Sequence, residues 1–233
     1  MKKIAIIPAR GGSKRIPHKN IRDFNGRPVI AYAIEAAKKS NLFDTVMVST
    51  DDHGIADIAA RYGAEVPFMR SATTADDNAT TADVLREVLT AYAEQGETFD
   101  IACCIYPTAP LLTRERLREA MELMEESDEP DVVMPIVRFS YPPQRAFVMK
   151  DGYLTMAEPQ NRDVRSQDLE PLYHDAGQFY LFRTESFLKD GQLLTGNVRA
   201  MELPELEVQD IDSETDWAMA ELKYRWIHAG EGV

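Results

Sequence analysis

Short apolar segments alternate along this chain with longer amphipathic segments, and this alternation most constrains its fold. Consecutive apolar residues are typical of strands that are buried on both faces of a parallel sheet. Such segments lie at 4–7, 45–50, 101–105 and 131–137. Amphipathic segments that predict helices lie at 28–40, 81–95, 113–126 and 213–227. The chain of 233 residues is therefore expected to form one α/β domain with a parallel sheet wound by right-handed crossovers.

Residues 138–171 interrupt the alternation with prolines, polar residues and short β-like segments. Asp151-Gly152, between two such segments, predicts a hairpin. We expect an excursion from the sheet that serves either as a lid over the site or as an arm used in assembly. A disordered linker is the alternative, which the aromatic content of the segment disfavours.

The loop after the first predicted strand holds two glycines, a serine and four cations, Arg10, Lys14, Arg15 and Lys19. Its exposed amides and cations predict a phosphate-binding loop, with a flexible basic loop as the alternative. The loop matches neither the Walker A pattern nor the Gly-x-Gly-x-x-Gly pattern, which argues against an ordinary ATPase or a nicotinamide dehydrogenase. The loops after residues 7, 50, 105 and 137 are expected to converge on the same site.

The charge distribution indicates the kind of ligand. The chain has 26 Lys and Arg and 39 Asp and Glu, a net charge of −13. Residues 1–27 hold eight cations and one acid, +7, whereas the remainder holds 18 cations and 38 acids, −20. A small basic region in an acidic protein favours a nucleoside triphosphate and argues against nucleic acid or an anionic membrane.

The two cysteines, Cys103 and Cys104, are neighbours on a predicted strand and should point to opposite faces, which disfavours a disulfide. We interpret them as buried residues of a reducing compartment. No apolar run is long enough to span a bilayer, and the N-terminal run is too short for a signal peptide. A cytoplasmic protein is expected, and no zinc signature is present.

Two further groups of residues carry chemistry. Asp210 and Asp212 share a face of an extended segment, so both carboxylates could bind one Mg²⁺, although Asp212 could instead cap the last helix. The segments 165–168 and 173–179 combine an arginine, amides and aromatic rings that could bind a sugar acid, or could be surface and core residues. His174 alone is interpreted as a structural histidine.

The run IPARGGSKRIPHKN resembles the motif Ile-Pro-Ala-Arg-x-x-Ser-Lys-x-x-x-x-Lys-Asn of the CMP-sugar synthetases for nonulosonic acids, the acylneuraminate cytidylyltransferase family. Further matches lie at 49–51, 79–84, 107–111, 167–169 and 210–212. The stretches IYPTAP, SYPPQRA, RSQDLEP and YHDAGQFY are most similar to members that use pseudaminic acid. Synthetases for sialic acid tend to have Gln at the position of Tyr106 and Asn-Gly at that of Ala176-Gly177, so these departures disfavour sialic acid.

The resemblance implies a Rossmann-like nucleotidyltransferase fold, with a core formed by 1–137 and 172–233 and an inserted arm, 138–171, that contributes to the sugar site and a homodimer. It implies the following nucleotide-binding residues: Ala9, Arg10, Gly11, Gly12, Ser13, Lys14, Lys19, Asn20, Thr80 and Thr81. It implies the following sugar-binding residues: Tyr106, Gln144, Arg165, Gln167, Tyr173, Gln178 and Phe179. Asp210 and Asp212 are implied as Mg²⁺ ligands, and Lys14, Lys19 and Asp210 as catalytic residues.

The activity implied is transfer of CMP from CTP to a nine-carbon 2-keto sugar acid, with release of pyrophosphate. Sialic, legionaminic or 3-deoxy-octulosonic acid are alternative substrates. A nucleotide-binding protein without catalysis is a second alternative, disfavoured because Lys14, Lys19, Asp210 and Asp212 are all present. A glycosyltransferase is a weaker alternative, since its metal-binding Asp-x-Asp is expected in the middle of the chain.

Overall fold

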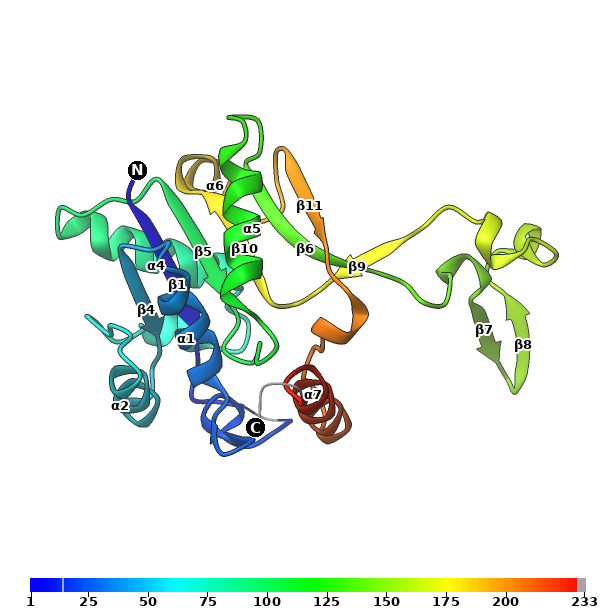
Figure 1. Cartoon of the computed structure of the whole chain (residues 1–233), viewed down its shortest axis with the longest axis horizontal. Helices are drawn as coiled ribbons and strands as arrows, with labels where there is room; N and C mark the ends of the chain where they lie inside the picture. Colours follow the sequence, from blue (N-terminus) through cyan, green and yellow to red (C-terminus); the bar gives the residue numbers. More distant parts are fainter. Residues whose placement is uncertain (14, 230–233) are drawn as a thin grey trace.

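The computed structural model describes residues 1–13 and 15–229. Its core is a seven-stranded sheet flanked by helices (Figure 1). In spatial order the main strands are β11 (Val198–Glu202), β6 (Val132–Arg138), β10 (Phe179–Arg183), β5 (Ile101–Ile105), β1 (Lys3–Pro8) and β4 (Thr45–Ser49). The expected α/β class is confirmed.

All but two strands of this sheet run in one direction. β1 pairs in parallel with β4 and β5, and β11 pairs in parallel with β6. β10 is antiparallel to both of its neighbours, β5 and β6. β9 (Tyr173–Asp175) is antiparallel to the carboxyl end of β6. The sheet is therefore mostly parallel, and the carboxyl ends of β1 and β5 lie side by side at one edge.

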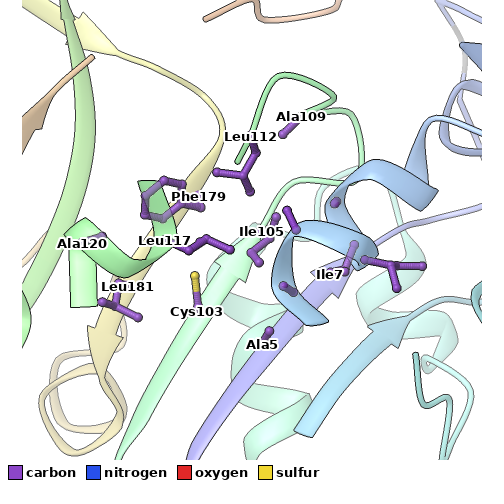
Figure 2. Packing of buried hydrophobic residues seen from close by; sticks show 14 of the residues in the cluster. Ala5, Ile7, Cys103, Ile105, Ala109, Leu112, Leu117, Ala120, Phe179 and Leu181 are labelled. Atoms are coloured by element: carbon purple, nitrogen blue, oxygen red, sulfur yellow. The ribbon is translucent and has the colours of Figure 1, made fainter. Parts of the chain in front are cut away.

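Helices cover both faces of the sheet. One cluster of buried residues joins alternate β1 residues, such as Ala5 and Ile7, to α1 (Ile30–Ser40), α2 (His53–Arg61) and α5 (Arg114–Glu125), and Figure 2 shows part of it. The other cluster joins Ile4 and Ile6 to α4 (Thr81–Glu94) and α6 (Thr184–Asp190). Cys103 and Cys104 fall in different clusters, and both are free thiols, as the strand geometry predicted.

The first helix begins later than predicted. We expected it from residue 28, but Pro28 belongs to a two-stranded hairpin, β2 (Asp23–Phe24) and β3 (Arg27–Pro28), and α1 starts at Ile30. Asn25 and Gly26 join the two strands with φ of 48° and 88°. Asn-Gly favours this kind of turn because both residues tolerate positive φ, so the hairpin signal was present in the sequence.

The final helix, α7 (Glu214–Ile227), packs beside the start of the chain. A third cluster of buried residues joins Trp217 and Ala220 of α7 to Ile16 of the basic loop, Phe24 of the hairpin and Ile211. Burial of these side chains brings the segment before α7 next to the loop, although nearly two hundred residues separate them in sequence. None of the helices in the described ranges is long and apolar enough to cross a membrane.

Residues 138–171, which we call the arm, extend away from the sheet (Figure 1). The predicted hairpin is present as β7 (Phe147–Lys150) and β8 (Tyr153–Met156), joined by Asp151 and Gly152 with φ of 50° and 83°. Short 3₁₀ turns make up much of the remainder: Pro143–Arg145, Pro159–Asn161 and Ser166–Asp168. The arm returns through β9, which pairs with β6.

Candidate active site

An open cleft of about 490 Å³ lies at the carboxyl ends of β1 and β5. One wall is the basic loop, and the opposite wall includes α3 (Ala72–Ala75) and the start of α4. Its lining residues are Pro8, Arg10, Ser13, Arg15, Lys19, Asn20, Arg70, Thr74, Asp76, Asp77, Ala79, Thr80, Thr81, Val84, Tyr106, Pro107 and Thr108. The loops after residues 7 and 105 thus meet as predicted, whereas the loop after 137 lines a separate cleft because β6 leads into the arm.

Hydrogen bonds to its backbone hold the basic loop. The Asn20 amide donates to the Arg10 carbonyl at 2.9 Å, and Asn20 is buried. The Gly11 amide donates to Asp51 Oδ1, also at 2.9 Å, which ties the loop to the residues after β4. A Cβ at Gly11 would lie 2.9 Å from the Cβ of Asp52, so only glycine fits there, whereas a Cβ at Gly12 would meet no atom within 4 Å. Gly11 therefore allows the close approach, and Gly12 borders open space.

Arg10 and Lys19 face the cleft from different ends of the loop. Arg10 forms an ion pair of 2.9 Å with Asp77 on the opposite wall. Lys19 begins a 3₁₀ turn, Lys19–Ile21, and its Nζ donates to the Ile211 carbonyl at 2.7 Å. The proposed catalytic residue Lys14 lies outside the described residues, so its role stays a prediction.

The segment before α7 brings two carboxylates to the basic loop. Asp212 forms an ion pair with Arg15, with 2.7 Å between the carboxylate and the guanidinium, and its carboxylate lies 3.7 Å from the Lys19 ammonium. The alternative role of Asp212, capping the last helix, is wrong: Ser213 is the N-cap and forms a capping box with Asp216. The Asp212 carboxylate is therefore available to a ligand at the loop.

Asp210 lies two residues before Asp212, and its carboxyl is influenced by burial and by two nearby charges. Burial raises the pKa of the Asp210 carboxyl, the nearby Asp212 carboxylate raises it further, and the Lys19 cation lowers it. Two carboxylates near one another favour a cation that neutralises both. In the described ranges no group of three or more His, Cys, Asp or Glu side chains could hold a metal. These two aspartates could bind Mg²⁺ only if phosphate or water oxygens complete its coordination.

The opposite wall starts with the N-terminus of α4. The Thr80 side chain caps this helix and forms a capping box with Asp83, so Thr80 and Thr81 are fixed where helix amides open towards the cleft. Arg70 also lines the cleft, and the sequence analysis missed it. Its guanidinium is buried, donates to the Ser49 carbonyl at 2.6 Å, and forms no ion pair with a described residue. No local motif marks Arg70, because only the folded chain shows that it is a buried cation.

The predicted sugar-binding residues do not form one group within the chain. Tyr106 lines the cleft. Gln178 and Phe179 are buried: the Gln178 amide donates to the Glu207 carbonyl at 2.6 Å, and Phe179 packs in the core (Figure 2). Neither side chain lines the cleft: Gln178 lies just before β10, and Phe179 begins this central strand and packs in the core.

The remaining predicted sugar residues are on or near the arm. Gln144 donates to the Glu170 carbonyl, Arg165 forms an ion pair with Asp168, and Gln167 lines the cleft at the base of the arm. Tyr173 is exposed on β9, and Nδ1 of its neighbour His174 donates a hydrogen bond to the Asp175 carbonyl at 2.8 Å. The arm projects from the sheet, so one chain does not bring these residues to the nucleotide cleft (Figure 1).

A basic loop and a helix N-terminus around a cleft at the strand ends, with two aspartates beside the loop, are typical of a class of protein, the α/β proteins that bind phosphorylated ligands. The sequence model of a family described as cytidylyltransferase matches residues 4–193. The chain belongs to this cytidylyltransferase family, whose members are nucleotidyltransferases.

Two relatives are similar over almost their whole length. Pseudaminic acid cytidylyltransferase of Campylobacter jejuni is 39% identical over 229 residues, which are 98% of this chain and 98% of that protein. CMP-N,N'-diacetyllegionaminic acid synthase of Legionella pneumophila is 32% identical and covers 95% of each chain.

Two solved structures share the fold. CMP:2-keto-3-deoxy-manno-octonic acid synthetase, complexed with CTP, has a TM-score of 0.71 at 19% identity and covers 98% of this chain and all of that chain. 4-Diphosphocytidyl-2C-methyl-D-erythritol synthase of Anaerococcus prevotii has a TM-score of 0.63 at 14% identity and covers 96% of this chain and 98% of that chain.

Proposed function

We propose that this protein transfers CMP from CTP to the anomeric hydroxyl of a nine-carbon 2-keto sugar acid, most consistently pseudaminic acid, and releases pyrophosphate. The observation that carries the proposal is the nearly full-length similarity to pseudaminic acid cytidylyltransferases, at 39% and 38% identity. The cleft supports it, because its basic loop and the helix N-terminus offer the positive potential that a triphosphate requires.

Catalysis in this proposal depends mainly on position and charge. The Gly12 amide and the side chains of Arg10, Ser13 and Lys19 bind the triphosphate, and Lys14 joins them by resemblance. The cations stabilise the charge that develops on the departing pyrophosphate. The cleft holds the sugar hydroxyl in line with the α-phosphorus, which replaces a bimolecular encounter by a positioned one.

Asp210 and Asp212 are the proposed Mg²⁺ ligands. Their fit rests on two acidic side chains beside the basic loop: Asp212 pairs with Arg15 and Lys19, and Asp210 interacts electrostatically with Asp212 and Lys19. Mg²⁺ held by these two carboxylates would supply positive charge that stabilises the phosphates and lowers the pKa of the attacking hydroxyl. In the ligand-free chain Arg15 and Lys19 neutralise Asp212 and thereby keep the two aspartates close to the loop.

The arm is proposed to complete the sugar site of a second subunit in a homodimer. Its exposed apolar side chains support this, because a surface with so many of them usually faces a partner. They are Tyr141, Phe147, Val148, Met149, Tyr153 and Leu154. Gln144, Arg165 and Gln167 would then contact the sugar acid across the subunit interface rather than in their own chain. We place this dimer in the cytoplasm, where free buried thiols persist.

A panel assay tests the function. The full chain is given CTP, Mg²⁺ and one sugar acid at a time, and pyrophosphate release is measured. We expect the highest kcat/KM with pseudaminic acid. An equal or higher value with legionaminic, sialic or 3-deoxy-octulosonic acid would overturn the choice of sugar. CTP binding without pyrophosphate release for any acid would support a non-catalytic nucleotide-binding protein instead.

A further inference from the structure

The segment 205–208 leads directly into the two aspartates at the basic loop, Asp210 and Asp212. β11 ends at Glu202, so this segment lies beyond the strand pairing of the sheet. It consists of a 3₁₀ turn, Glu205–Glu207, and one extended residue. Its backbone carbonyls therefore need hydrogen-bond donors from other elements, and those donors decide where the segment lies.

Arg116 of α5 holds the carboxylate of Glu207 with two parallel hydrogen bonds. Its Nε donates to Oε2 at 2.8 Å, and its Nη2 donates to Oε1 at 2.9 Å. The two side chains are only 28% and 26% exposed, so solvent screens the pair less than it screens a surface ion pair. A bidentate contact fixes orientation as well as distance. Glu207 is therefore anchored to a helix that packs on the sheet.

Two further side chains hold the backbone of the same segment. The Gln178 amide is buried and donates to the Glu207 carbonyl at 2.6 Å. Lys223 of α7 donates to the carbonyls of Glu205 and Val208, at 3.0 and 2.6 Å. Helix α5, helix α7 and the residue before β10 thus fix four consecutive residues.

The turn that carries Gln178 also contacts Asp210. Its neighbour Gly177 has a φ of +63°, and a Cβ there would lie 3.8 Å from the Cβ of Asp210, an ordinary van der Waals distance. The Gln178 carbonyl accepts from the amide of Tyr106, a residue that lines the cleft, at 2.8 Å. Gln178 therefore connects the wall of the cleft, Glu207 and the surroundings of Asp210.

We propose that the contact between Arg116 and Glu207 positions the carboxylate of Asp210 and thereby sets the affinity of this site for a divalent cation. The inference rests on the proposed function, because it takes Asp210 and Asp212 as the metal ligands. Glu207 does not bind the cation; it acts through the two residues of backbone that separate it from Asp210. A shift of the segment would weaken cation binding even with both carboxylates present, because partners outside the ligand set orient the ligands.

The test compares Glu207→Gln with Glu119→Gln. Glu207→Gln replaces one accepting oxygen by an NH₂ group and so breaks the bidentate contact. Glu119 is the matched control, because its carboxylate also pairs with Arg116, at 2.6 Å, but belongs to α5 itself. Gln178→Met is a second variant that keeps a side chain of similar size and removes the amide. Asp210→Asn shows how much of the cation binding depends on the proposed site.

Mn²⁺ alone is the probe, and the EPR signal of the free ion measures its binding. We expect the wild-type protein to bind Mn²⁺ and Asp210→Asn to lose this binding. Glu207→Gln and Gln178→Met should raise the Kd for Mn²⁺ by about tenfold, a typical effect of a residue that orients metal ligands. Glu119→Gln should stay within about twofold of the wild type. Urea unfolding of each variant shows whether stability and Mn²⁺ affinity change separately.

Unchanged Mn²⁺ affinity in Glu207→Gln, or in Gln178→Met if Glu207→Gln does not fold, would overturn the inference. An equal loss of affinity in Glu119→Gln, or wild-type protein whose Mn²⁺ binding is absent or does not need Asp210, would also overturn it. The measurement uses neither CTP nor a sugar acid, so it is separate from the proposed function. Absence of turnover with every acid would overturn that function, whereas a tenfold loss of Mn²⁺ affinity would still support the positioning role.

Discussion

At the scale of single residues, Asp210 is a proposed Mg²⁺ ligand whose ionised form lowers the stability of the ligand-free fold. Burial and the neighbouring Asp212 carboxylate raise its pKa, whereas Lys19 lowers it. A carboxyl group whose pKa is higher in the folded than in the unfolded chain binds its proton more tightly when folded. Stability from this group is present at low pH and is lost as the pH rises through the folded pKa, so the ionised Asp210 destabilises the ligand-free fold at neutral pH.

Asp210→Asn should therefore separate activity from stability. We expect turnover to fall about a hundredfold or more, because a charge in the proposed transition-state site is lost. We also expect the Tm of the ligand-free variant to exceed that of the wild type at pH 7. This difference should shrink as the pH falls towards 3.8, the value for an ordinary aspartate.

Circular dichroism melts at several pH values and a pyrophosphate assay measure both effects. Asp57→Asn on the exposed face of α2 is the control and should change neither quantity. A variant with normal turnover, or with a lower Tm than the wild type at pH 7, would contradict the role given to Asp210.

Tyr92 offers a second prediction about a single residue. Its buried hydroxyl has no hydrogen-bond partner among the described residues, and burial raises its pKa from 10.0 to about 12. Tyr92→Phe should stabilise the fold by about 1 kcal/mol, since an unpaired buried hydroxyl is removed. The gain should grow as the pH rises from 10 to 12, because only the wild type then loses stability by ionisation in the unfolded chain. Urea unfolding measures this, and a loss of stability in the variant would contradict it.

At the scale of elements, the basic loop depends on α7 for its position. Ile16 of the loop is fully buried with Trp217 and Ile211, next to the two aspartates. Arg22 adds an ion pair of 2.6 Å with Glu214 and lies over the Trp217 ring. The loop and the segment before α7 therefore form one unit, although the sequence presents them as two motifs at opposite ends of the chain.

Ile16→Ala should reduce both stability and nucleotide binding. We expect a loss of about 3 kcal/mol in the free energy of unfolding, as for other large-to-small changes in a core, and a higher KM for CTP. Leu117→Ala in α5 is the matched control, because Leu117 is buried in a different cluster. Leu117→Ala should lower the free energy of unfolding by a comparable amount and leave the KM for CTP unchanged. Equal KM values for CTP in the two variants would contradict this prediction, because the loop would then keep its position without the contact of Ile16 with α7.

The elements also show what a sequence can predict. The strands at 4–7 and 101–105 and the Asp151-Gly152 hairpin follow from local patterns, and all are present. The hairpin at Asn25-Gly26 had an equally local signal and was missed because Pro28 was assigned to the helix. The buried position of Arg70 beside the cleft has no local signal, since contacts with residues distant in sequence create it.

At the scale of the whole molecule, the arm is the part whose apolar side chains the single chain leaves exposed. Its hairpin exposes Phe147, Met149 and Tyr153, and the residues that we propose for the sugar site lie on the same excursion. A second copy of the chain would cover these apolar side chains and bring the arm to a cleft. The resemblance predicts this assembly.

Met149→Asp combined with Tyr153→Asp should weaken the proposed dimer, because two charges would be buried at its interface. We expect light scattering after size exclusion to show a shift from dimer to monomer at micromolar concentration. We also expect the KM for the sugar acid to rise more than the KM for CTP. The control is Lys150→Asp on the same hairpin, which reverses a charge at an exposed position that is already charged. A variant that stays a dimer with unchanged kinetics would contradict the role of the arm.

The central claim is that one cleft, built from the basic loop, the α4 N-terminus and Asp210, activates a sugar acid with CTP. The most direct measurement is pyrophosphate release by the wild-type chain with CTP, Mg²⁺ and pseudaminic acid, with product identified by mass spectrometry. We predict one equivalent of CMP-sugar for each pyrophosphate, and loss of both products without the sugar acid. Pyrophosphate release that does not need a sugar acid, or none with any nonulosonic acid, would contradict the claim.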